Sequence, residues 1–149
     1  MAESVQKLTH IEHVLKRPDS YVGPVDTSSE SYWLLNKTTQ KFQKKNITYS
    51  PALLKIFDEI LVNAIDRNSV HPKNVTNISV SVDKETGTVA IENNGPLGGI
   101  GVKMHEKEGL WNPELTFGHL LTSTNYDDTQ KRIVGGRNGY GAKLTNIYS

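Results

Sequence analysis

Three polar residues at helical spacing, Glu59, Asn63 and Asp66, are the first candidates for chemistry in this sequence. Residues three or four apart lie on the same face of a helix, so these side chains would project as one narrow stripe. An asparagine carbonyl is a hard oxygen ligand of the kind that Mg²⁺ prefers, and a carboxylate one turn away can polarise a water molecule. The stripe therefore has two interpretations: a magnesium–nucleotide site, or an amphipathic helix whose outer face merely carries polar groups.

A glycine-rich segment, GGRNGYGAK at 135–143, is the second candidate. Glycines just before a helix expose backbone N–H groups at the positive end of its dipole, which suits phosphate oxygens, and Lys143 would add a positive charge one turn in. The segment is not a P-loop, because Ala142 stands where the lysine should be. It is not a dinucleotide-binding fingerprint, because Gly139 and Gly141 lack the third glycine. The catalytic-loop HRD and DFG motifs of protein kinases are also absent.

A third candidate is the loop at 95–101, which contains four glycines. Its backbone could approach a ligand closely, because glycine has no side chain to obstruct the approach. The alternative is a flexible surface loop that binds nothing. These glycine segments and the polar stripe need a scaffold that brings them together.

The element that carries the stripe is a predicted helix at 50–68, SPALLKIFDEILVNAIDRN, with Ser50 as N-cap and Pro51 in the first helical position. At about 100° per residue its apolar side chains form one broad arc opposite the stripe. The arc consists of Leu53, Phe57, Ile60, Leu61, Ala64 and Ile65.

The other elements follow from capping signals and apolar periodicity. We expect a helix at 9–16 capped by Thr9, a strand at 32–35, a solvated turn at 37–45 and a hairpin at 76–92. Asn112 and Pro113 should open a further helix, and the last helix should follow the 135–143 segment. The helix that begins at Asn112 carries Leu115, Phe117, Leu120 and Leu121, and the last helix carries Leu144 and Ile147. The polar stretch 126–134 is predicted to be mobile without a ligand and ordered with one.

Composition restricts the class of protein without naming a partner. The chain has 149 residues, of which 36% are hydrophobic and 22% charged, enough for one globular domain. It has no cysteine, so disulfides and thiolate metal sites are excluded. No signal peptide or membrane-spanning stretch is found, so we expect an intracellular protein without a membrane partner. The formal net charge of +1 argues neither for nor against nucleic acid.

Several long segments resemble one known family. KIFDEILVNAID, ENNG, FGHLLTSTNYDD and GGRNGYGAKLTNIYS are closely similar to the ATPase domain of eukaryotic-type DNA topoisomerase II, and IEHVLKRPDSYVGPV matches the same family. That domain belongs to the GHKL group, which includes gyrase B, Hsp90, MutL and sensor histidine kinases. The resemblance covers nearly the whole chain. It points to the eukaryotic branch, which includes the related enzymes of large DNA viruses.

The resemblance implies a fold and a set of site residues. The fold is an α/β (α+β) two-layer sandwich, the GHKL or Bergerat fold, with helices on a mixed, mostly antiparallel sheet. Glu59 would be the general base that activates the attacking water, Asn63 would bind Mg²⁺, and Asn93 would lie near the adenine. The remaining nucleotide contacts would come from Ser123, Thr124 and Asn125 at the ribose and phosphates, and from Arg137, Asn138, Gly139, Tyr140, Gly141 and Lys143 around the triphosphate.

The resemblance also implies ATP and Mg²⁺ as cofactors, DNA as partner of the complete enzyme, a homodimer formed on ATP binding, and a nuclear location, or a viral factory if the source is a large DNA virus. Residues 1–149 would be the N-terminal part of a single ATPase domain, without the transducer, cleavage and C-terminal domains. This segment alone would then be inactive. The alternatives are a GHKL chaperone-like or regulatory nucleotide-binding module, and a truncated remnant without turnover.

The sequence departs from the family pattern at particular positions. Arg67 stands where close relatives usually have asparagine, and Val5 stands where they often have tyrosine. The 95–101 loop is longer than usual by two residues, and Gly101 replaces a customary proline. The departure at 67 affects one expected nucleotide contact, and the departures in the loop affect the adenine side of the expected site.

Overall fold

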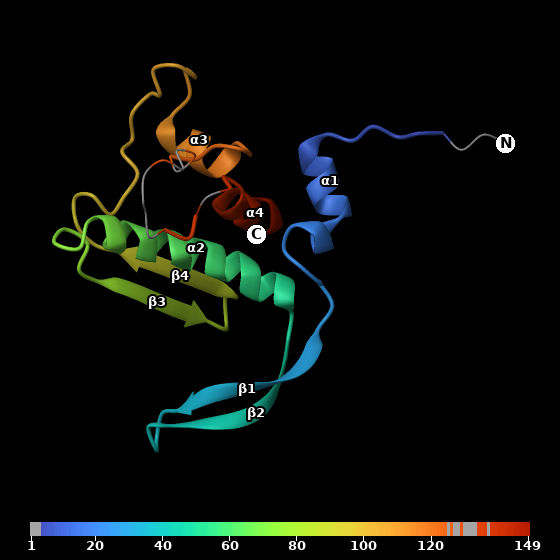
Figure 1. Ribbon diagram of the computed structural model, residues 1–149, viewed down its shortest axis with the longest axis vertical. Coiled ribbons are helices and arrows are strands. Elements are labelled where there is room, and N and C mark those ends of the chain that lie inside the picture. Colours follow the sequence, from blue (N-terminus) through green and yellow to red (C-terminus); the bar gives the residue numbers. More distant parts are fainter. Residues whose placement is uncertain (1–3, 125, 127–128, 130–133, 137) are drawn as a thin grey trace. The chain divides into compact units, whose positions relative to one another are not determined.

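The computed structural model describes residues 4–124, 126, 129, 134–136 and 138–149 (Figure 1). The chain divides into two compact units, Met1–Lys55 and Ile56–Ser149. Most of the 126–134 stretch, and with it the prediction about its mobility, lies outside the described residues. Within the described part, no helix combines the length and apolar character needed to cross a membrane.

The first unit begins with helix α1 (His10–Lys16), which a capping box starts. The Thr9 backbone N–H donates to Glu12 Oε2 over 2.7 Å, and the Glu12 N–H donates to Thr9 Oγ1 over 3.3 Å. Because the Thr9 N–H and hydroxyl both donate to this carboxylate, the pKa of Glu12 is lowered. The predicted helix at 9–16 with Thr9 as its cap is confirmed, and Val14 is its fully buried residue.

A long hairpin follows a short 3₁₀ turn at Pro18–Ser20. Strands β1 (Ser28–Asn36) and β2 (Lys41–Tyr49) pair antiparallel along their whole length. The sequence predicted only residues 32–35 as strand, and it wrongly predicted a solvated turn over the full 37–45 range. Lysines at 41, 44 and 45 hide the apolar alternation by which a strand is recognised, and most of β2 is exposed.

The turn itself is short because Asn36 closes it. Its Oδ1 accepts hydrogen bonds from the backbone N–H groups of Thr38 and Thr39, at 2.9 and 3.1 Å. Gln40 then adopts a φ of 55°, in the left-handed region, and its N–H donates to the Asn36 carbonyl. Asparagine side chains stabilise turns by this local bonding, so the chain reverses within 37–40 and pairing resumes at Lys41.

Helix α2 (Pro51–Val70) begins as the sequence predicts. Ser50 Oγ accepts a hydrogen bond from the Leu53 N–H over 3.3 Å and donates to the Val25 carbonyl over 2.9 Å. The N-cap assignment of Ser50 and the first-turn position of Pro51 are therefore confirmed. The helix ends at Val70, two residues beyond the predicted end.

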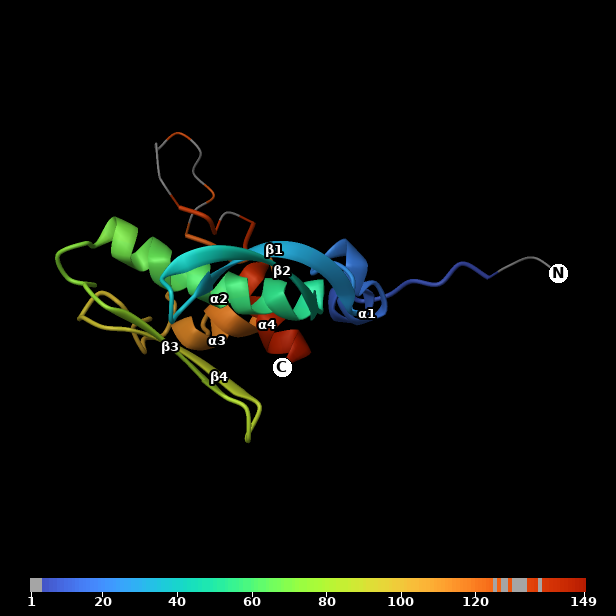
Figure 2. The same cartoon turned by 90° about the horizontal axis from the view of Figure 1, so that it is seen from below.

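The second unit contains the greater part of α2, the hairpin β3 (Ile78–Asp83) and β4 (Thr88–Asn93), and helices α3 (Asn112–Gly118) and α4 (Gly141–Tyr148). In Figure 1, α2 lies between this hairpin and the α3–α4 pair, and Figure 2 shows the hairpin turn projecting away from the helices. The Thr145 hydroxyl on α4 donates to the Ile56 carbonyl of α2 over 2.8 Å. The predicted hairpin and last helix are confirmed. Among the described residues of this unit, the buried apolar ones are Ala64, Val75, Ala142 and Leu144.

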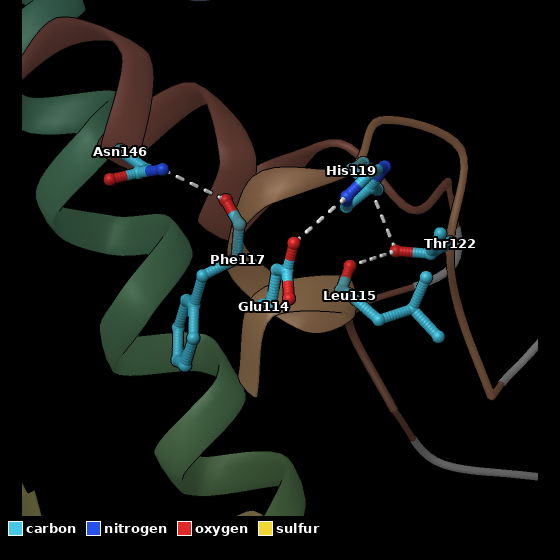
Figure 3. A network of polar contacts seen from close by, with 6 residues as sticks. All are labelled: Glu114, Leu115, Phe117, His119, Thr122 and Asn146. Carbon is cyan, nitrogen blue, oxygen red and sulfur yellow. Dashed lines mark hydrogen bonds and ion pairs between the residues drawn. The ribbon is translucent and has the colours of Figure 1, made fainter. Parts of the chain in front are cut away.

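Helix α3 is shorter than the sequence predicts, because it ends at Gly118 and leaves Leu120 and Leu121 beyond it. Leu121 has a φ of 62°, which is not helical. The Thr122 hydroxyl lies 2.9 Å from the carbonyl oxygens of both Leu115 and His119, and so satisfies acceptors that the helix end leaves open (Figure 3).

Candidate functional site

The polar stripe of α2 faces the glycine-rich segment 135–143, as the magnesium–nucleotide interpretation requires. Glu59 and Asp66 are half-buried, whereas Asn63 is exposed. All three side chains approach glycines of that segment: Glu59 lies at Gly141, whereas Asn63 and Asp66 both lie at Gly136. These contacts join positions about seventy to eighty residues apart in the chain.

Glu59 packs directly against Gly141, the first residue of α4. A Cβ atom built on Gly141 would touch Glu59 Oε2 and would lie 2.8 Å from Glu59 Cδ and 3.3 Å from Glu59 Cβ. No other amino acid fits there unless the carboxylate moves. The structure thus places the predicted base at the N-terminus of the helix whose N–H groups were predicted to bind phosphate.

Asp66 holds the start of the glycine segment by backbone hydrogen bonds. The Gly135 N–H is bonded to Asp66 Oδ1 over 2.8 Å and Oδ2 over 3.1 Å, and the Gly136 N–H donates to Oδ2 over 2.9 Å. Asn63 Oδ1 lies beside it, 3.3 Å from a Cβ built on Gly136. The sequence predicts Asp66 on the stripe but indicates no function for it. Its position one turn beyond Asn63 was the only signal in the sequence. The structure adds that Asp66 faces the same glycines.

Lys143 is buried, with 5% of its surface exposed, and its Nζ donates to the Thr122 carbonyl over 2.7 Å. Burial lowers the pKa of this lysine. Gly139 lies against the same residue, since a Cβ built on it would be 2.9 Å from the Thr122 carbonyl oxygen. Its φ of 68° also favours glycine. Lys143 and Gly139 therefore fix the segment that leads to Ser123 and Thr124.

Asn93 ends β4, at the edge of the 95–101 loop. Its Nδ2 donates to the Gly98 carbonyl over 2.9 Å. The neighbouring Asn94 accepts hydrogen bonds from the N–H groups of Thr76 and Asn77, both at 2.9 Å. The first turn of this loop is therefore held by side chains.

Four other predicted contact residues lie in or beside these segments. Tyr140 is half-buried and immediately precedes α4, Ser123 is half-buried and follows Thr122, and Asn138 and Thr124 are exposed. Asn125 and Arg137 lie outside the described residues.

The donor set matches the chemistry of a phosphate–magnesium group. Gly141 starts a helix, so N–H groups of its first turn lack helical acceptors and can bind an anion. Asn63 offers an amide oxygen, and Glu59 a carboxylate beside the same helix end. Among the described residues no cluster of three or more His, Cys, Asp or Glu could hold a metal ion, so water molecules and phosphate oxygens would have to complete the coordination of any Mg²⁺ at Asn63.

Known proteins are similar to this chain in sequence and in fold. No protein-family model matches the chain. DNA topoisomerase 2 of Penicillium chrysogenum is 48% identical over 149 residues, which are 100% of this chain and 9% of that protein. The Saccharomyces cerevisiae protein of the same name is 48% identical over 148 residues, 99% of this chain and 10% of its own length. The chain therefore spans about a tenth of the length of these relatives.

Solved structures of topoisomerase II show the same similarity. The ATPase region of Saccharomyces cerevisiae topoisomerase II superposes with a TM-score of 0.92 at 48% identity, covering 97% of this chain and 38% of that one. The ATPase and transducer domains of the Balamuthia mandrillaris enzyme give a TM-score of 0.91 at 51% identity, covering 97% and 36%.

The fold class is therefore that of the GHKL ATPases, as predicted. Both sheets in the described part are two-stranded and antiparallel, within the helix-and-sheet architecture of that group. The chain is homologous, over nearly its whole length, to the ATPase region of DNA topoisomerase II.

Proposed function

We propose that this chain binds ATP with Mg²⁺ and forms part of the ATP-hydrolysing site of a type IIA DNA topoisomerase. Homology to the ATPase region of topoisomerase II supports the proposal. The observation that carries it is the contact between Glu59 and Gly141, because it puts a carboxylate beside the N-terminus of α4. Phosphoryl transfer to water needs a positioned base and fixed positive partial charges, and this contact unites both.

Each residue of the site then has a distinct function. Glu59 accepts a proton from the attacking water, and the first N–H groups of α4 bind the phosphate oxygens. Asn63 ligates Mg²⁺, which neutralises developing charge on the phosphates when it is bound. Asp66 does not need to touch the nucleotide, because it orients Gly135 and Gly136.

Further residues extend the site toward the ribose and base. Asn93 would contact the adenine side. Ser123, Thr124 and Asn125 would line the ribose and phosphates, and Arg137, Asn138, Gly139, Tyr140 and Lys143 would surround the triphosphate. Burial of Lys143 against Thr122 favours a role in shaping this wall over a free approach to phosphate.

The activity of the whole enzyme is the broader part of the proposal. In it, ATP binding closes a homodimer around a transported DNA duplex, and the protein acts where the genome lies, in the nucleus or in a viral factory. The names of the relatives support DNA as the eventual substrate.

Two measurements test the proposal. The purified chain should bind a fluorescent ATP analogue more tightly with Mg²⁺ than without it. For hydrolysis, the chain should replace the matching segment of the Saccharomyces cerevisiae ATPase region, and the chimaera should hydrolyse ATP. Nucleotide binding without turnover in the chimaera would favour the alternative of a regulatory GHKL module. No binding in either protein would contradict the proposal.

A further inference from the structure

Arg67 connects α2 to the loop that follows β4. It lies one turn beyond Asn63 and is half-buried, and its Nε donates a hydrogen bond to the Leu97 carbonyl over 3.1 Å. The roles proposed above do not use this arginine. Its contact nevertheless falls on the loop that Asn93 also holds, at the carbonyl just before the one that Asn93 binds.

The turn at 95–98 is fixed at several points. Asn93 Nδ2 bonds to the Gly98 carbonyl, and the Gly98 N–H donates to the Gly95 carbonyl over 3.1 Å. Gly95 has a φ of 90° and lies so close to Asn74 that a Cβ built on it would be 2.7 Å from the Asn74 carbonyl carbon. Arg67 supplies the contact from the helix that also carries Glu59 and Asn63.

The spacing along α2 separates the two ends of the site. Glu59 and Arg67 are eight residues apart, which is about 12 Å along a helix axis. A nucleotide whose terminal phosphate lies beside Glu59 and whose base lies near Asn93, as proposed above, would have its base beside the 95–98 turn. A wall that is already ordered lowers the entropic cost of binding that base.

We propose that Arg67 is a positioning residue that fixes the 95–98 turn through the Leu97 carbonyl, and thereby sets the affinity and base selectivity of the nucleotide site. The inference rests on the proposed function for its ligand. In this proposal the loop requires the hydrogen-bond donor of Arg67 and not its positive charge.

Two substitutions separate donor from charge. Arg67→Gln keeps an N–H donor and removes the charge, whereas Arg67→Met removes both at similar length. Loss of one hydrogen bond to a partly exposed carbonyl should weaken ATP binding by about threefold to tenfold in the methionine variant, with a smaller loss for GTP. The glutamine variant should stay within about twofold of wild type. Lys73→Ala, which removes an exposed positive charge shortly after α2, is the matched control and should change nothing.

The measurements are magnesium-dependent titrations with ATP and GTP, and hydrogen exchange at the Gly98 amide without nucleotide. Faster exchange in Arg67→Met, but not in Arg67→Gln, is expected. Equal ATP affinity and exchange in wild type and Arg67→Met would overturn the inference, as would equal losses in both variants, which would assign the effect to charge. If neither the wild-type chain nor the chimaera binds either nucleotide, the proposed function fails and the nucleotide part of this inference fails with it. Exchange at Gly98 then decides the positioning part alone.

Discussion

The ammonium group of Lys143 donates a hydrogen bond to the backbone carbonyl of Thr122 across 2.7 Å, inside the second unit of the chain. A lysine with 5% of its surface exposed is unusual, because a buried ammonium loses most of its hydration. The bond to Thr122 recovers part of that loss and ties α4 to the segment after α3. The neighbouring Ala142 and Leu144 are buried as well, so the start of α4 is well anchored.

This burial predicts a pH dependence of stability. The pKa of Lys143 is lowered in the folded protein, so the unfolded chain binds the proton more tightly. The resulting destabilisation is fully present below the lowered pKa and disappears as pH rises to the ordinary value of 10.5. Urea unfolding of Lys143→Met between about pH 7 and pH 10 should therefore show a flatter rise of the unfolding free energy than wild type. The exposed Lys84→Met should keep the wild-type slope; a Lys143→Met profile parallel to wild type would contradict the assignment.

Glu59→Gln should separate binding from turnover. Glutamine has nearly the same shape but cannot accept a proton, so hydrolysis by the chimaera should fall roughly 10²- to 10⁴-fold while nucleotide affinity is nearly unchanged. Steady-state phosphate release and an analogue titration measure the two effects. Asp58→Asn, which alters an exposed carboxylate on the same helix, serves as control. Turnover at the wild-type rate would remove Glu59 as the base.

Asn63→Ala should weaken the magnesium dependence of ATP binding, because a methyl group cannot ligate the ion. Affinity measured in a chelator should change much less than affinity measured with Mg²⁺. Asn68 belongs to the same helix, but its side chain bonds to the Val75 carbonyl, so Asn68→Ala should lower stability and leave the magnesium effect intact. An undiminished magnesium effect in Asn63→Ala would count against the ligand role.

Gly141→Ala should impair the site even though alanine is the best helix former. The added Cβ would collide with the Glu59 carboxylate, so the base must turn away and both affinity and hydrolysis should fall, by about tenfold or more. Gly118→Ala, at the end of α3, is the matched control, because nothing lies within 4 Å of a Cβ built there. Equal activity of the two alanine variants would show that the Glu59–Gly141 contact has no functional weight.

Asp66→Asn should loosen the glycine segment. Asparagine retains one acceptor oxygen but replaces the other by a donor, so at least one of the hydrogen bonds from Gly135 and Gly136 is lost. We expect faster hydrogen exchange at these two amides and a loss of about 1 kcal/mol in unfolding free energy. Asp58→Asn should leave both unchanged. Protection at Gly135 equal to that of wild type would rule out the anchoring role.

The elements that carry clear local signals could be predicted from sequence. Ser50 and Thr9 are strong helix caps, and the alternation Ile78, Val80, Val82 identifies a strand without reference to the rest of the fold. Strand β2 could not be recognised, because its lysines are solvated and its partner, rather than its composition, makes it a strand.

The candidate site, too, could be predicted from the sequence only in part. Spacing on one helix predicted the stripe of Glu59, Asn63 and Asp66. That Asp66 accepts hydrogen bonds from Gly135 and Gly136, and that Lys143 turns toward Thr122, depends on contacts between distant segments. Local sequence holds no information about such contacts until the fold is known.

The amide of Asn94 has a further consequence for strand register. By accepting hydrogen bonds from Thr76 and Asn77 it ties the open end of the β3–β4 hairpin in one alignment, in which Ile78 pairs with Asn93. A slip of one residue would turn every side chain of β4 to the opposite face. Asn93 would then point away from Gly98. Asn94, which contacts no ligand in the proposed site, thus helps to keep β4 and the 95–98 turn in register.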